Sequence, residues 1–111
     1  MSLAGKVAIV TGGTRGIGRA ACVAFAREGA KVVVVGRNQS GYDAVAGQIV
    51  AEGGTAIGVR ADVAREGEVA AMVSKARQSY DRIDVLVNSA GVNLPYTTVA
   101  ELTLEQWNWV V

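Results

Sequence analysis

The stretch VTGGTRGIGRA, residues 10–20, decides the fold of this chain. It holds four glycines and two arginines, and it joins an apolar run to an amphipathic one. A glycine-rich turn between a strand and a helix lets backbone amides approach an anion, and the helix N-terminus adds partial positive charge. Gly12 would take the tight turn, Gly16 would permit the close approach, and Gly18 would let the helix pack on the sheet. The stretch therefore predicts a phosphate-binding turn.

The stretch allows two other interpretations. The glycines could serve only a tight turn and helix packing, with no ligand. A P-loop is the second alternative, because Gly13 and Gly18 have the separation that it requires. However, Arg19 and Ala20 stand where a P-loop needs Lys and then Ser or Thr to hold phosphate and magnesium. The strand before and the helix after favour phosphate binding over a turn that serves packing alone.

Apolar periodicity orders the rest of the chain. Continuous β-branched runs are typical of strands buried on both faces. They occupy residues 6–11, 31–36 and 83–88, and Gly58 dilutes a weaker run at 55–62. Helical patterns lie between them at residues 16–29, 40–54 and 65–80. This alternation predicts an α/β fold, a Rossmann-like doubly wound parallel sheet with strand order 3-2-1-4 and right-handed crossovers.

Composition limits the remaining possibilities. The chain has 111 residues, of which 50% are hydrophobic, so we expect a single dinucleotide-binding domain over residues 1–111. A net charge of +1 gives no field that would attract nucleic acid or an anionic membrane. No apolar run approaches the roughly 20 residues of a membrane span. The single cysteine, Cys22, fits a reducing cytoplasm, and the absence of histidine argues against a metal site.

The end of the second expected strand bears on the choice of cofactor. An NAD site carries Asp or Glu there, where it holds the ribose 2′-hydroxyl. This chain has Gly36-Arg37-Asn38 instead. A guanidinium can bind a 2′-phosphate bidentately, and Arg15 in the glycine turn could reach the same region. The sequence therefore predicts NADP(H) as the cofactor in preference to NAD(H).

Together these motifs resemble those of the short-chain dehydrogenase/reductase family. The residues that carry the resemblance are Thr11-Gly12-x-x-x-Gly16-x-Gly18, then Asp62-Val63, then Asn88-Ser89-Ala90-Gly91. Ser89 departs from the family's usual second Asn. The match runs from Lys6 to the end of the chain, and the closest members in appearance are 3-oxoacyl-[acyl-carrier-protein] reductases.

The resemblance implies a role for each matching position. Thr14, Arg15 and Ile17 would line the pyrophosphate and adenosine side, and Arg37 and Asn38 would take the 2′-phosphate end. Asp62 and Val63 would flank the adenine. Asn88, Ala90 and Gly91 would lie at the ribose. From the residues alone, Asp62 could equally be a helix N-cap, and Asn88 could be only a strand-end residue.

The resemblance also implies an activity, namely NADP(H)-dependent oxidation or reduction of a carbonyl/alcohol pair, with 3-oxoacyl thioester reduction the commonest, in a homo-oligomer. In the family a Tyr-x-x-x-Lys pair acts with a serine. Here Tyr42, Tyr80 and Tyr96 are followed four residues later by Ala, Asp and Ala. We therefore expect no catalytic residue in this chain, which resembles the truncated N-terminal half of such an enzyme. A non-catalytic NADP-binding module and an inactive fragment are the alternatives.

Overall fold

Strands and helices alternate along the part of the chain that the computed structural model describes, residues 3–14 and 16–88. The elements are β1 (Val7–Thr11), α1 (Gly16–Arg27), β2 (Lys31–Gly36), α2 (Gln39–Ala51), β3 (Thr55–Arg60), α3 (Glu66–Tyr80) and β4 (Val85–Asn88). The expected elements are confirmed, with ends that differ by at most three residues. A capping-box pattern at Thr103 and Gln106, which predicts a further helix, lies outside the described residues.

The strands form one parallel sheet in the order β3-β2-β1-β4, as the sequence predicts. In the middle of the sheet, Ile9 of β1 lies between Val33 of β2 and Leu86 of β4. Because all the strands run the same way, their carboxyl ends share one edge. The turns that follow β1, β2 and β3 therefore lie next to one another, at the place where open α/β sheets bind ligands.

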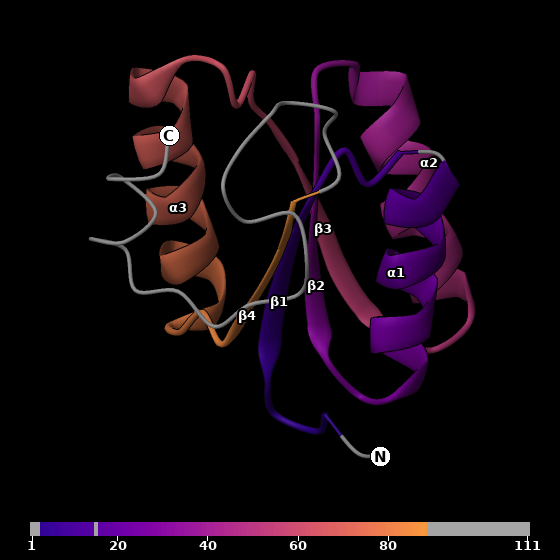
Figure 1. The fold of residues 1–111 in the computed structure, drawn as a ribbon. Helices are drawn as coiled ribbons and strands as arrows, with labels where there is room; N and C mark the ends of the chain where they lie inside the picture. Colours follow the sequence, from indigo (N-terminus) through magenta and orange to yellow (C-terminus); the bar gives the residue numbers. More distant parts are fainter. Residues whose placement is uncertain (1–2, 15, 89–111) are drawn as a thin grey trace.

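Helices cover both faces of the sheet (Figure 1). Ile9 and Val33 belong to a buried cluster with Met72 of α3. Val34, the next residue of β2, belongs to a second cluster with Cys22 of α1 and residues of α2. Successive strand residues point to opposite faces, so a strand covered on both sides must be apolar throughout. This requirement explains the uninterrupted valine run of β2.

A polar contact ties the start of β4 to the start of β1. The Asp84 carboxylate accepts a hydrogen bond from the amide of Val7 at 2.8 Å, and the Asp84 amide donates to the Val7 carbonyl at 2.9 Å. Arg82 also donates to this carboxylate, with one Nη2–Oδ1 distance of 2.6 Å. The hydrogen bonds from Arg82, and then the one from Val7, lower the pKa of Asp84 below its usual value.

We expect Asp84→Ala to lower the free energy of unfolding by about 1–3 kcal/mol, because it leaves the buried Val7 amide without its acceptor. The lowered pKa makes this stabilisation complete above the ordinary carboxyl pKa of about 3.9 and removes it as pH falls through the folded value. Urea unfolding of the full-length protein at several pH values measures the difference. A loss no greater than that of Glu66→Ala, an exposed acid with no partner among the described residues, would contradict this role.

Candidate cofactor site

The turn between β1 and α1 adopts the backbone conformation that its glycines predict. Gly12 and Gly16 have φ values of +66° and +60°, a region that side-chain-bearing residues rarely adopt. Gly16 is exposed and is the first residue of α1, so the helix begins within the turn itself. The N-terminal amides of α1 thus lie at the carboxyl edge of the sheet, where an anion can reach them. Arg15 lies outside the described residues.

Gly13 is a tightly packed position of this turn, a feature that its local sequence pattern does not reveal. A Cβ built on Gly13 would come within 2.9 Å of the Cys22 sulfur and 3.1 Å of the Val10 carbonyl oxygen. The Cys22 thiol is fully buried behind the turn, contacts the Gly13 carbonyl at 3.8 Å, and has its pKa raised by burial to about 12. Cys22 is therefore a packing residue that supports the turn from inside.

Thr14 joins the glycine turn to the turn that follows β2. A Cβ on Gly36 would lie 2.7 Å from Thr14 Cγ2, and one on Gly41 would lie 3.2 Å from Thr14 Cβ. The threonine side chain thus fits a space left by two glycines, one at the end of β2 and one in the first turn of α2. This packing fixes the glycine turn against the segment that carries Arg37.

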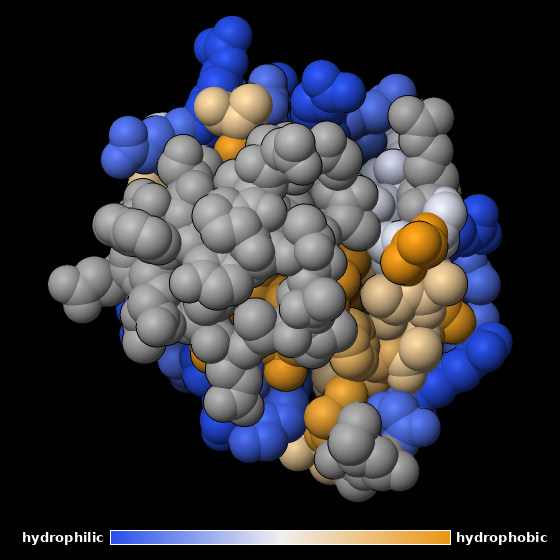
Figure 2. Space-filling view, viewed as in Figure 1, coloured by the Kyte–Doolittle hydropathy of each residue, from blue (hydrophilic) through white to orange (hydrophobic). Residues whose placement is uncertain are grey.

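Ile17 and Gly18, both in the first turn of α1, differ sharply in burial. Gly18 is buried, as expected for a glycine that packs on the sheet, whereas Ile17 is 82% exposed. Figure 2 shows apolar residues gathered over the region of α1, to the right of the residues drawn in grey. An exposed isoleucine beside backbone amides offers an apolar contact next to an anion site.

Arg37 and Asn38 follow directly after β2. The Arg37 side chain is exposed and makes no hydrogen bond or ion pair among the described residues. Asn38 is the N-cap of α2, since its Oδ1 accepts from the Ser40 amide at 3.0 Å and from the Ser40 hydroxyl at 2.8 Å. The Asn38 oxygen therefore serves the helix, and its NH2 group is the part that can meet a ligand.

The turn after β3 holds Asp62 and Val63. Asp62 Oδ1 accepts from the Ala64 amide at 3.0 Å, so this side chain closes a local turn. It is not the N-cap of α3, a position that Arg65 occupies without a side-chain hydrogen bond. Val63 is only 6% exposed and packs in the core cluster under α3, so its side chain is not open to a ligand.

The third predicted segment of the site is described only in part. Asn88 ends β4 and pairs with Thr11 at the end of β1, which places its backbone beside the glycine turn. Ala90 and Gly91 lie outside the described residues. Over residues 3–14 and 16–88 no helix is both long and apolar enough to span a bilayer, and no group of acidic, Cys or His side chains is arranged to hold a metal ion.

A parallel sheet with a glycine turn after β1 and further loops at the same edge defines a nucleotide-binding α/β protein of the Rossmann type. The family model for short chain dehydrogenases matches residues 6–111. The chain belongs to the short-chain dehydrogenase family.

Individual relatives agree with this assignment. A 3-oxoacyl-[acyl-carrier-protein] reductase from Synechocystis sp. is 42% identical over 111 residues, which cover 99% of this chain and 44% of that protein. A metagenomic short-chain oxidoreductase in complex with NADP superposes with a TM-score of 0.79 at 40% identity, over 85% of this chain and 42% of that one. A 7α-hydroxysteroid dehydrogenase complexed with NADH superposes with a TM-score of 0.77 at 38% identity, over 78% of this chain and 34% of that one. The chain thus spans less than half the length of these relatives.

Proposed function

We propose that this chain supplies the cofactor-binding half of an NADP(H)-dependent oxidoreductase that acts on a carbonyl/alcohol pair. Arg37 carries the choice of cofactor. It follows β2 directly, at the position where an NAD site places a carboxylate, and its guanidinium has no partner among the described residues. A free guanidinium can form paired, charge-assisted hydrogen bonds with a 2′-phosphate. The solved relatives include both an NADP and an NADH complex, so they do not favour either cofactor. The proposal of NADP(H) therefore rests on Arg37.

The turns at the carboxyl edge fit the parts of such a cofactor. The amides around Gly12 and Gly16 would meet the pyrophosphate, with Thr14 and Ile17 beside them, while Gly18 keeps the helix close to the sheet. Arg37 and the Asn38 NH2 group would bind the 2′-phosphate, with Arg15 proposed on the family pattern. Asp62 and the backbone at Val63 would border the adenine. Asn88, Ala90 and Gly91 are proposed for the ribose, again on the family pattern.

We assign no catalytic residue to this chain. The bound nicotinamide would supply or accept the hydride, while the residues of this chain would bind and orient the dinucleotide. The proton-transferring groups and the substrate-binding half would belong to other parts of the full-length protein, because no Tyr-x-x-x-Lys pair occurs in the sequence. We infer a homo-oligomer in the cytoplasm, a location that the buried, unpaired Cys22 fits.

A 3-oxoacyl thioester is the substrate that we propose first, on the basis of the Synechocystis relative. Full-length protein mixed with NADPH and acetoacetyl-coenzyme A should then consume NADPH, as measured by the loss of nicotinamide absorbance. NADPH binding without turnover of any simple ketone or thioester would favour the second candidate, a non-catalytic NADP-binding module, which the missing Tyr-x-x-x-Lys pair supports. Absence of nucleotide binding would overturn both candidates.

A further inference from the structure

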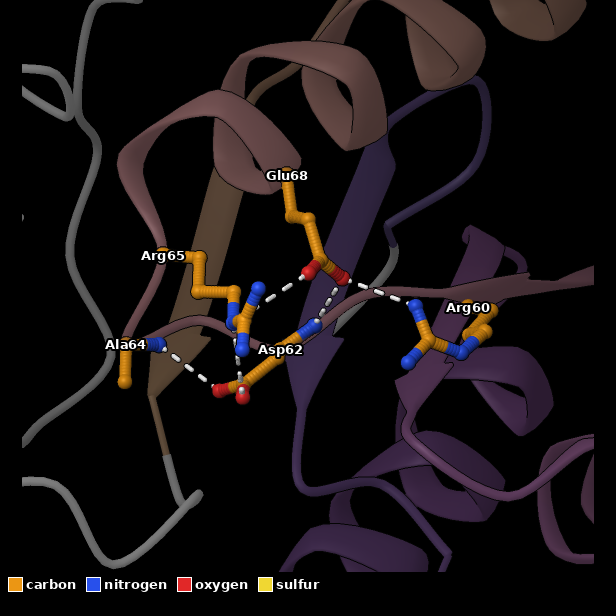
Figure 3. Close-up of polar contacts among 5 residues, drawn as sticks. All are labelled: Arg60, Asp62, Ala64, Arg65 and Glu68. Atoms are coloured by element: carbon orange, nitrogen blue, oxygen red, sulfur yellow. Dashed lines mark hydrogen bonds and ion pairs between the residues drawn. The ribbon is translucent and has the colours of Figure 1, made fainter.

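A cluster of four charged side chains surrounds the turn after β3 and includes a carboxylate that the proposed function does not use. Arg60 ends β3, Asp62 and Arg65 lie in the turn, and Glu68 comes from the beginning of α3 (Figure 3). The cluster balances two positive charges against two negative ones. Asp62 is the member that the proposed function places at the adenine, so whatever fixes this turn also fixes that end of the cofactor site.

Glu68 accepts a hydrogen bond from the backbone just beyond the end of β3. The last sheet-like hydrogen bond runs from the Ala61 amide to the Gly36 carbonyl at 3.0 Å. The next amide along the chain, that of Asp62, donates instead to Glu68 Oε1 at 2.9 Å. A carboxylate of α3, and not a neighbouring strand, therefore supplies the acceptor for this amide. This hydrogen bond is also the main reason why the pKa of Glu68 is lowered.

The same carboxylate holds the side chains on either side of the turn. Glu68 Oε1 also accepts from Arg60 Nη1 at 2.8 Å, and Glu68 Oε2 lies 3.8 Å from Arg65 Nε. Arg65 Nε is in turn 3.9 Å from Asp62 Oδ2. Figure 3 shows Glu68 directed down onto this turn, between Arg60 and Arg65. One side chain thus links the end of β3, the amide of Asp62 and the residue that caps α3.

We propose that Glu68 is a positioning residue for the adenine end of the cofactor site, acting through its hydrogen bond to the Asp62 amide. This inference rests on the proposed function, since it needs a nucleotide bound at the turn. Asp62 has a side chain 29% exposed and its Oδ1 is engaged by Ala64, so the turn offers a fixed surface to a planar ring. Without Glu68 the Asp62 amide loses its acceptor and Arg60 loses its ion pair.

The sign of the effect separates positioning from simple electrostatics. The dinucleotide is an anion, so removal of a negative charge near it should by itself tighten binding. Loss of a positioning hydrogen bond should instead weaken binding of the dinucleotide. Glu68→Ala removes both the charge and the acceptor, whereas Glu68→Gln removes the charge and keeps an oxygen that can accept from Asp62. Glu66→Ala removes the same charge from the same helical turn, and Glu66 has no partner among the described residues.

The test is calorimetric titration of the full-length protein and these variants with NADPH and with adenosine 2′-phosphate, which carries only the adenine end. We expect Glu68→Ala to weaken both ligands by the same factor, about two- to tenfold, the effect of one hydrogen bond. We expect Glu68→Gln, which keeps the acceptor, and Glu66→Ala, which does not touch it, both to bind these ligands at least as tightly as the unmodified protein. Should Glu68→Ala fail to fold, Glu68→Asp, whose shorter side chain withdraws the acceptor, is expected to weaken both ligands in the same way.

Two results would overturn the inference without touching the proposed function. One is unchanged affinity in Glu68→Ala, or in Glu68→Asp if that variant is used. The other is an equal loss in Glu68→Gln, which would show that the acceptor oxygen is not what matters. If the unmodified protein binds neither ligand, the proposed function fails and this inference fails with it.

Discussion

Replacing Gly58 by alanine is expected to destabilise the fold by about 1–3 kcal/mol, the usual effect of an extra methyl group in a packed interior. A Cβ on Gly58 would overlap the ring of Tyr42, lying 3.0 Å from its Cε1 atom and closer still to Cδ1. Tyr42 is only 8% exposed and belongs to the core cluster between α2 and the sheet. The ring cannot retreat without lifting the first turns of α2, which follow Arg37 and Asn38.

The same substitution elsewhere in the chain provides the control. Gly47 lies inside α2 with nothing within 4 Å of its potential Cβ, so Gly47→Ala is expected to stabilise the helix by roughly 0.5–1 kcal/mol. In a Tyr42→Ala background, Gly58→Ala should be less destabilising, because the ring atoms Cδ1 and Cε1 that the added methyl group meets are gone. Chemical unfolding of the full-length variants measures all of these values. If Gly58→Ala proves as stable as the unmodified protein, the strand tolerates a side chain there and this packing account is wrong.

Replacing Arg37 by alanine is expected to weaken NADPH binding by roughly 10- to 100-fold, the factor that corresponds to one charge-assisted hydrogen bond. NADH affinity should hardly change, because NADH lacks the 2′-phosphate. Arg37→Asp should go further and reverse the preference, since a carboxylate repels the phosphate and can accept from a ribose 2′-hydroxyl. Titrations of the full-length variants with both nucleotides give the two affinities directly.

Arg77→Ala is the matched control for Arg37. Arg77 is exposed, lies in the last turn of α3, and has no side-chain partner among the described residues. Its removal lowers the net charge by the same amount without touching the carboxyl edge of the sheet. An equal loss of NADPH affinity in Arg37→Ala and Arg77→Ala would mean that Arg37 acts only through overall charge. Equal losses for NADPH and NADH in Arg37→Ala would likewise remove its role at the 2′-phosphate.

The sequence predicted those parts of the fold that depend on local pattern. The valine run of β2 and the glycine turn after β1 each carry their own signal, because burial on two faces demands apolar residues and a positive φ favours glycine. Gly58 was interpreted as a weakness of β3. In the structure it provides the space that Tyr42 fills, a contact between distant residues that no local pattern reveals.

The supporting residues of the candidate site were harder to predict for the same reason. Glu68 follows the start of a helical pattern, where a negative charge is favourable, but no local pattern shows that its carboxylate accepts a hydrogen bond from the Asp62 amide. Thr14 was expected to line the pyrophosphate, and the sequence did not reveal that Gly36 and Gly41 make room for it. Asn38 was expected at the 2′-phosphate, and it also caps α2. An asparagine directly before a helical pattern, as Asn38 is here, is a capping signal that could have been recognised.

The most direct test of the central claim is a calorimetric titration of the unmodified full-length protein with NADPH and, separately, with NADH. Arg37, which has no partner among the described residues, predicts that NADPH binds at least about tenfold more tightly. NADH binding that equals or exceeds NADPH binding would contradict the assignment of this edge of the sheet to a 2′-phosphorylated cofactor.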